Sequence, residues 1–405
     1  MTDIVKPADI RQAAKNIENA VVNTPFTQSK TLSMITGADI FLKFEIFQFT
    51  AAYKERGALN RLLALSEDEK KRGIIAMSAG NHAQGVSYHA SRLGIPATIV
   101  MPFGTPFNKV KRTEELGATV KLIGKTLEES TSAALKLADE HHYTFIHPFD
   151  DPLVIAGQGT VALEMLEVEA DLDILLIPIG GGGLIAGMAT IAKEINPNIK
   201  IIGVQTESFP SMKQAVEGGS HDFLAPTIAE GIAVKNPGTH TAAIVRDLVD
   251  EIVIIPETRI EEAIVLCMEI EKVVVEGAGA TGLAALMEYP EKFKGQKVGL
   301  VLTGGNIDSR LLASAIMRGM ARDGRLSRLR VTMLDVPGSL AQVSEVVASV
   351  GANVLELRHQ REFGAVSLKM TEMEMVIEAK DRDHAEMVIK KLEEAGFTVA
   401  HAKTV

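Results

Sequence analysis

The sequence has a single cysteine, and its pattern leads us to expect neither a secretory leader nor a membrane span. Cys267 is the only cysteine among 405 residues, so an intramolecular disulfide is excluded and a reducing compartment is favoured. Residues 2–20 mix Asp, Lys and Arg in a helical pattern without an apolar run, so we expect no signal peptide. The longest apolar stretch, 172–192, contains Pro178 and four consecutive glycines, which favours strand, turn and helix over a membrane span. We therefore expect a cytoplasmic protein without a membrane partner.

Basic residues are not concentrated enough to indicate a nucleic-acid partner. The net charge is -10, and Lys and Arg are scattered except for a short run at Arg325, Arg328 and Arg330, which is more simply a solvated linker. The apolar content of 46% is ordinary for a globular protein. A chain of this length predicts two or more domains.

Short β-rich runs alternate with helical patterns between Gly73 and Gln205. One helix, ending near Ala138, is expected to open with a capping box of Thr126 and Glu129. Strands that alternate with helices predict an α/β fold with parallel sheets, and such sheets place ligands at the carboxyl ends of their strands. The expected strands are 74–77, 97–101, 119–123, 143–146, 173–179 and 200–205.

The pattern changes near Ala321. A polar linker is predicted at 322–328, with Gly324 as a hinge. The order from 329 to 405 is strand, helix, strand, strand, helix, strand, which is a ferredoxin-like βαββαβ unit of the size of a small domain. The expected strands are 329–334, 353–360, 365–377 and 398–402, and the expected helices are 339–350 and 382–395.

Four consecutive glycines lie between an apolar strand and an apolar helix. Such a turn lets the backbone approach an anion closely and direct its N–H groups toward it, beside a helix N-terminus. It lacks the Lys and Ser/Thr of a P-loop and the spacing of the dinucleotide fingerprint. Both phosphate binding and simple tight packing therefore remain open. The glycines are Gly180, Gly181, Gly182 and Gly183.

Lys54 lies among small and aromatic residues in Ala51-Ala52-Tyr53-Lys54. A lysine desolvated there would have a lowered pKa and could form a Schiff base. The commoner outcome for a single lysine is exposure and pairing with a neighbour such as Glu55.

Two further segments end strands with polar groups. Ser78-Ala79-Gly80-Asn81-His82 offers a hydroxyl, an amide and backbone N–H groups at a helix start, which suit a carboxylate or phenolate oxygen, although simple N-capping by Ser78 or Asn81 explains the same residues. The strand at Leu300–Leu302 ends in Thr303-Gly304-Gly305-Asn306.

Along the chain the four motifs follow the order Lys54 segment, Ser78 segment, glycine turn and Thr303 segment. Motifs in this order resemble those of the fold-type II pyridoxal-phosphate enzymes, specifically the threonine and serine dehydratases, over residues 10–320. The resemblance implies two parallel-rich αβα lobes within a catalytic domain at 1–321, the smaller lobe spanning roughly 50–150, and pyridoxal 5′-phosphate as cofactor. It implies conversion of L-threonine to 2-oxobutanoate and ammonia by α-proton abstraction and β-elimination. Members of this family are homodimers or homotetramers.

The resemblance also implies a role for each matching residue. Lys54 would hold the cofactor as a Schiff base and then remove the α-proton of the amino-acid substrate. Asn81 would contact the ring hydroxyl, and the hydroxyl of Thr303 would face the pyridine nitrogen. The phosphate would rest on Gly180, Gly181, Gly182, Gly183 and Leu184, and the substrate carboxylate on the loop of Ser78, Gly80 and His82.

Residues 329–405 resemble an ACT regulatory domain, of the kind attached to threonine dehydratases. The matching turn between strand and helix contains Asp335, Pro337, Gly338 and Leu340. The resemblance implies that an amino-acid effector binds there.

The sequence departs from the family pattern at two places. Ala51-Ala52-Tyr53 stands where Gly-Ser-Phe is common, which leaves the contacts to the substrate open. Ala79 stands where serine racemases of this fold have a second serine, and a methyl group cannot transfer a proton, so racemisation should be poor.

Several polar residues have simpler interpretations than a site. His141, His142 and His147 lack the spacing of a metal site and are expected to be solvated or at helix ends. Glu207 matches a position where some relatives bind a cation, although a loop carboxylate is usually solvated. Glu276 resembles a residue near the cofactor ring, or is an acid that interacts with a helix N-terminus.

Two other functions remain open at this point. One is a dehydratase that prefers serine or a hydroxyaspartate, since the pocket near Tyr53 decides the accepted side chain. The other is an amino-acid-responsive binding protein without catalysis, against which the intact Lys54 argues.

Overall fold

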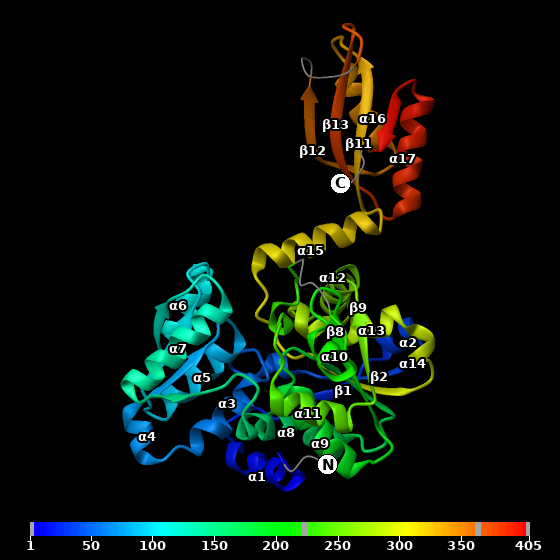
Figure 1. The fold of residues 1–405 in the computed structure, drawn as a ribbon. Coiled ribbons are helices and arrows are strands. Elements are labelled where there is room, and N and C mark those ends of the chain that lie inside the picture. The colour runs from blue at the N-terminus through cyan, green and yellow to red at the C-terminus, as the bar shows by residue number, and fades with distance from the viewer. Residues whose placement is uncertain (1–3, 221–225, 361–365, 402–405) are drawn as a thin grey trace. The chain divides into compact units, whose positions relative to one another are not determined.

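The computed structural model describes residues 4–220, 226–360 and 366–401. Its tertiary contacts divide the chain into two units, Met1–Asp308 and Ser309–Val405 (Figure 1). Among the described residues, no helix combines the length and the apolar composition that a membrane crossing requires.

The first unit contains two sheets made almost entirely of parallel strands. One has the order β1-β2-β10-β7-β8-β9, and only its β1–β2 pair is antiparallel; the other has the order β5-β4-β3-β6 and is wholly parallel. The strands of the first are β1 (Phe26–Gln28), β2 (Asp39–Lys43), β7 (Ile174–Pro178), β8 (Lys200–Thr206), β9 (Glu251–Ile255) and β10 (Lys297–Val301). Those of the second are β3 (Ile74–Met77), β4 (Ala97–Met101), β5 (Thr119–Leu122) and β6 (Thr144–Phe145). The predicted α/β class is confirmed.

Helices connect and cover these strands, as parallel pairing requires. The central strands β4 and β7 are buried along their whole length, and separate apolar clusters lie around the two sheets. The helices are α1 (Pro7–Ile17), α2 (Lys30–Thr36), α3 (Lys54–Leu63), α4 (Glu67–Arg72), α5 (Asn81–Arg92), α6 (Phe107–Glu115), α7 (Leu127–His141), α8 (Pro152–Val168), α9 (Gly183–Ile195), α10 (Ser211–Glu217), α11 (Thr239–Leu248), α12 (Glu257–Leu266), α13 (Gly277–Glu288) and α14 (Pro290–Phe293). Short helical turns are η1 (Glu45–Phe47), η2 (Glu230–Ile232) and the π-helical η3 (Cys267–Glu271).

The second unit consists of α15 (Ser309–Arg322) followed by β11 (Leu326–Leu334), α16 (Ser339–Ser349), β12 (Asn353–Gln360), β13 (Met370–Glu378), α17 (Arg382–Glu394) and β14 (Thr398–His401). The strands form an antiparallel sheet with the order β12-β13-β11-β14. Val343 and Val388 of the two later helices pack on alternate strand residues such as Val331 and Met373. The predicted βαββαβ order is confirmed, while Ala365 and Ala402, expected in strands, lie outside the described residues.

Three local predictions need correction. The linker predicted at 322–328 comprises only Asp323, Gly324 and Arg325, because the buried–exposed alternation of β11 begins at Leu326. The helix predicted to end near Ala138 continues to His141. Thr126 caps it by accepting the N–H of Glu129 at 3.2 Å, but the Glu129 carboxylate accepts the N–H of Lys125, so the reciprocal half of the capping box is not formed.

A buried network of four charges fixes the start of α3. The guanidinium of Arg56 donates to both carboxylate oxygens of Glu45 at 2.8 Å and to Glu164 at 2.5 and 2.8 Å. The side chains of Arg56 and Glu45 are fully buried, and Lys43 completes the network with a 2.5 Å bond to Glu164. Two cations and two anions balance, so the network is stable only while it is complete.

Replacing Arg56 with Met should therefore be costly. The variant leaves the buried carboxylate of Glu45 without its cation, and we expect the free energy of unfolding to fall by about 3 to 5 kcal/mol. Arg11→Met, which breaks a half-exposed pair with Glu194, is the control and should cost about 1 kcal/mol or less. Chemical denaturation of the three proteins measures both values. Equal losses in the two variants would contradict this assignment.

Candidate active site

Lys54 is the first residue of α3, and it lies beside the segment after β10. The backbone N–H of Tyr53 donates to the carbonyl of Thr303 at 3.1 Å, and Ala52 forms an isolated antiparallel bridge with Gly304. The Lys54 amine donates to the carbonyl of Pro148 at 2.8 Å. The first and fourth motifs of the sequence therefore meet at this amine.

The surroundings of Lys54 change its acidity. Burial lowers the pKa of the amine to about 8, and the negative charge of Glu276 opposes part of this shift. Roughly a tenth of the amine is then neutral at pH 7, a far larger share than an exposed lysine has. The alternative of an exposed lysine paired with Glu55 is wrong, because Glu55 is itself buried and binds the N–H of Thr50.

Asn81, Glu276 and Asn306 form a second polar group in the same region. The amide of Asn81 donates to Glu276 at 2.7 Å, and the amide of Asn306 donates to the side-chain oxygen of Asn81 at 2.8 Å. A Cβ at Gly304 would lie 2.5 Å from the Glu276 carboxylate. Glu276, whose role the sequence left open, thus lies where the motifs of Asn81 and Thr303 meet, at the start of α13.

Glu276 is an unusual acid. Burial raises the pKa of its carboxyl to about 7, and the hydrogen bond from Asn81 opposes part of the shift. The folded protein therefore binds more protons than the unfolded chain between the ordinary value of 4.5 and about 7. Stability due to this group is present below pH 4.5 and is lost as the pH rises through that interval.

Replacing Glu276 with Gln should remove this dependence on pH. We expect the cofactor-free wild type to lose more free energy of unfolding between about pH 5 and pH 7 than Glu276→Gln does. Urea denaturation at several pH values measures the difference. Parallel pH profiles of the two proteins would contradict the raised pKa.

The glycine turn is buried and its donors face no protein acceptor. Among the described residues, the backbone N–H groups of Gly180, Gly181, Gly182 and Gly183 donate to no protein oxygen. Gly182 has φ +95°, which favours glycine, and α9 begins at the next residue. Buried N–H groups without partners are costly, so an anion is a ligand that these four donors could hold.

The glycine turn and Lys54 contact consecutive residues of one segment. Pro148 accepts the Lys54 amine, and the next residue, Phe149, covers the turn so closely that a Cβ at Gly181 would overlap its ring. Glycine at this turn is therefore explained partly by tight packing against Phe149 and partly by the backbone N–H groups that have no protein acceptor. Lys54 and the third motif therefore lie on the two sides of Pro148 and Phe149.

The loop at Ser78 leads into α5, and one of its backbone N–H groups is already hydrogen-bonded within the loop. The hydroxyl of Ser78 accepts the N–H of Gly80 at 3.2 Å. His82 is buried and places its Nε2 3.0 Å from the carbonyl of Ile146, which requires a proton on that nitrogen. Burial, with the nearby charge of Lys54, lowers the pKa of His82 to about 3. Its ring is therefore neutral, and its other nitrogen is a buried acceptor without a partner, so the ring cannot bind a carboxylate by charge.

Other predicted residues have surroundings of a different kind. Leu184, next to Gly183, belongs to the apolar cluster around the larger sheet. Glu207 accepts the N–H of Glu257 at 3.4 Å, and the described residues contain no cluster of three His, Cys, Asp or Glu that could hold a metal. Cys267 is buried as expected, and burial raises the pKa of its thiol to about 12.

The candidate effector residues lie in the second unit. Three of them are in the exposed turn between β11 and α16, and Leu340 is the second residue of α16. Gly338 has φ +99° and precedes the first residue of α16. Exposure leaves the turn accessible to a small molecule. The exposed residues are Asp335, Pro337, Gly338 and Leu340.

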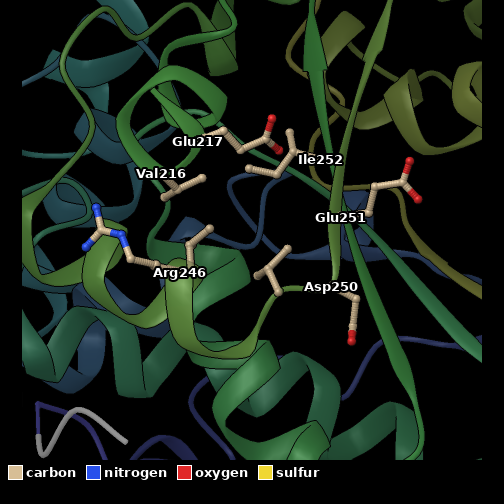
Figure 2. Close-up of a pocket in the computed structure, with 8 residues that line it drawn as sticks. Val216, Glu217, Arg246, Asp250, Glu251 and Ile252 are labelled. Carbon is tan, nitrogen blue, oxygen red and sulfur yellow. The ribbon is translucent and has the colours of Figure 1, made fainter. Parts of the chain in front are cut away.

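A surface pocket between α10, α11 and β9 contains none of the predicted site residues (Figure 2). Its walls include the charged side chains of Glu217, Arg246 and Glu251, which come from the three elements. The chemistry-bearing groups gather instead around Lys54.

Sequence reasoning missed the residues that join the motifs. His147, expected to be solvated or at a helix end, accepts the N–H groups of Phe149 and Asp150 through Nδ1 at 3.3 and 2.8 Å. Asp151-Pro152 carries a usable signal, an acidic N-cap followed by proline, and Asp151 does cap α8. Nothing local marks Pro148, because its partner Lys54 is 94 residues away.

Residues 17–304 match the family model described as "Pyridoxal-phosphate dependent enzyme". This chain belongs to that family. Its fold is therefore the fold-type II arrangement expected from the motifs, and the cofactor of the family is pyridoxal phosphate.

Named relatives align along nearly the whole chain. An L-threonine ammonia-lyase of Thermotoga maritima is 43% identical over 96% of this chain and 98% of its own length. One of Geobacter sulfurreducens is 41% identical over the same shares. A catabolic L-threonine dehydratase of Staphylococcus aureus is 42% identical over 78% of this chain and 93% of its own.

Solved structures with this fold include both lyases and racemases. Threonine deaminase isoform 2 of Solanum lycopersicum has a TM-score of 0.72 at 35% identity, covering 76% of this chain and 88% of that one. Maize serine racemase has a TM-score of 0.73 at 34% identity, covering 79% and 99%.

The residues present fit pyridoxal phosphate. A phosphate matches the four buried N–H groups of the glycine turn. An aldehyde matches an amine whose pKa is lowered by burial. The unpartnered buried nitrogen of His82 and the amide of Asn81 add polar groups within the same loop.

Proposed function

We propose that this protein is an ammonia-lyase that converts L-threonine to 2-oxobutanoate and ammonia. The main supporting observation is the Lys54 amine of lowered pKa, which is bound to the carbonyl of Pro148, the residue before Phe149 that packs on the unpartnered glycine turn. The relatives named L-threonine ammonia-lyase, which align over 96% of this chain, favour threonine over other hydroxy amino acids.

Each residue then has a defined task. Bound pyridoxal phosphate supplies an electron-accepting ring that makes the Cα–H of an attached amino acid acidic. The neutral amine of Lys54 takes the proton from the substrate Cα. The N–H groups of Gly180 to Gly183 would hold the phosphate, and the amide of Asn81 would contact the ring hydroxyl. Backbone N–H groups in the loop of Ser78 and Gly80 would receive the substrate carboxylate.

Thr303 would favour elimination. Its hydroxyl is neutral, so it would not hold the pyridine nitrogen of a bound cofactor protonated as a carboxylate would. Departure of the substrate β-hydroxyl, which takes up a proton and leaves as water, would then be favoured over transamination. Thr303 is buried, and its backbone carbonyl is fixed by Tyr53, so the residue is rigidly placed for this task.

Replacing Lys54 tests the function directly. With pyridoxal phosphate present, we expect the wild type to release 2-oxobutanoate from L-threonine and Lys54→Ala to be slower by at least about a hundredfold. Lys111→Ala, which removes an exposed amine on α6, is the control and should match the wild type. Failure of the wild type to release a keto acid from L-threonine would contradict the proposal. Faster release from L-serine or hydroxyaspartate would mean that this compound, and not threonine, is the preferred substrate.

Racemisation is a function of structural neighbours that we do not assign to this chain. Maize serine racemase shares the fold, but Ala79 places a methyl group where racemases of this fold have a second base. Ala79 is packed against the apolar cluster of the smaller sheet, and it cannot return a proton to the opposite face of Cα.

The second unit is proposed to be a regulatory ACT domain. The exposed turn at Asp335, Pro337, Gly338 and Leu340 would bind an amino-acid effector, and binding that differs between two states would change the activity of the first unit.

We further propose a cytoplasmic homodimer or homotetramer. The single buried cysteine is compatible with a reducing compartment.

Replacing Asp335 with Ala tests the effector site. If isoleucine or valine changes the rate on threonine, we expect Asp335→Ala to need at least about tenfold more of that effector, because an interaction with its amino or carboxyl group is lost. Asp383→Ala, a change in α17 away from the turn, is the control. An unchanged effector concentration at half response in Asp335→Ala would contradict this placement.

A further inference from the structure

Four residues, 147–150, connect the two halves of the proposed cofactor site, and we call them the connecting segment. The carbonyl of Pro148 accepts the Lys54 amine at 2.8 Å. Phe149 packs against the glycine turn, where a Cβ at Gly183 would lie 3.0 Å from its atoms. The position of this segment therefore sets the distance between the amine and the anion-binding turn.

One carboxylate holds the segment against the start of α11. Asp150 accepts three backbone N–H groups, those of Thr239, His240 and Thr241, at 3.0, 3.0 and 3.1 Å. These are donors that a helix start leaves without intrahelical partners, and a negative charge there is favourable. Gly238 has no room for a Cβ, which would overlap the Asp150 carboxylate. Carboxylate and helix start are thus closely matched.

The same helix start also fixes the glycine turn. The hydroxyl of Thr241 donates to the carbonyl of Gly181 at 2.6 Å, and the N–H of Gly238 donates to that carbonyl at 3.3 Å. In a trans peptide the carbonyl of one residue and the N–H of the next point in opposite directions. Because α11 holds the Gly181 carbonyl on its side, the N–H of Gly182 points away from α11 and stays available to an anion.

We propose that Asp150 is a positioning residue for the cofactor phosphate. It binds the start of α11, which orients the Gly181–Gly182 peptide, and it places Phe149 and Pro148 between that peptide and Lys54. Its charge is satisfied by three N–H groups, so its contribution is geometric. This role rests on the proposed function only in taking the glycine turn as the phosphate site.

The adjacent Asp151 provides a matched control. It also caps a helix, accepting the N–H groups of Leu153 and Val154 at 2.8 and 3.2 Å, and it pairs with Arg61 at 2.9 Å. Its helix is α8 and its partner is on α3, so it has no bond to the glycine turn or to α11. Replacing either aspartate with alanine therefore removes a helix cap. Only Asp150 is also linked to Gly181, through the start of α11.

The test compares dissociation constants of the cofactor-free proteins for pyridoxal phosphate and for pyridoxal, which lacks the phosphate. We expect Asp150→Ala to bind pyridoxal phosphate about tenfold or more weakly and pyridoxal as the wild type does. Asp150→Asn should stay within about threefold of the wild type for both, because Asn is also a strong helix cap. Asp151→Ala should leave pyridoxal phosphate binding within about threefold. Thermal melting checks that each variant is folded.

A second variant covers the case in which Asp150→Ala does not fold. Thr241→Val removes the hydroxyl bond to Gly181 at 2.6 Å, together with the longer contact to the Gly238 carbonyl at 3.2 Å, and should show the same loss for pyridoxal phosphate alone. Unchanged binding in folded Asp150→Ala or Thr241→Val, or equal losses for both ligands, would overturn this role. A wild type that binds pyridoxal phosphate but does not act on threonine would contradict the proposed function and not this inference.

Discussion

The site depends on one constraint, which is that four buried peptide N–H groups at the start of α9 have no protein acceptor among the described residues. Folding removes these donors from water without giving them partners, and an anion is the group that restores the loss. The neighbouring positions of Phe149 and Lys54 matter for catalysis because an anion bound at the glycine turn would hold the rest of its molecule beside the amine of Lys54. Burial then gives that amine a pKa of about 8.

Rigidity around Lys54 comes from a buried charge in the first turn of its helix. Arg56, two residues further on, is bound by Glu45 of η1 and Glu164 of α8. Such pairs contribute little net stability compared with apolar packing, but they specify one arrangement and penalise others. The first turn of α3 is thereby held in place, while the lysine side chain that it carries ends at a carbonyl rather than at a counter-ion.

Local motifs made much of this predictable from the sequence. Lys54, Asn81, Thr303 and the glycine turn each follow a strand or open a helix, so their approximate neighbourhood could be predicted from the α/β pattern and the family resemblance. Side-chain orientation could not. The His82 ring is kept neutral mainly by burial, and its tautomer is set by the Ile146 carbonyl, which is 64 residues away. Asp150 and its partner Thr239 are separated by 89 residues, and no local pattern relates them.

The most direct measurement is to load the protein with pyridoxal phosphate, reduce it with borohydride and map the labelled lysine by peptide mass spectrometry. The account predicts a pyridoxyl group on Lys54. The informative competitor is Lys43, which is also buried and has a pKa lowered by burial, but its amine is bound by Glu164 and the Thr24 carbonyl. Label on Lys43 or on any other lysine, or no label at all, would contradict the site described for this chain.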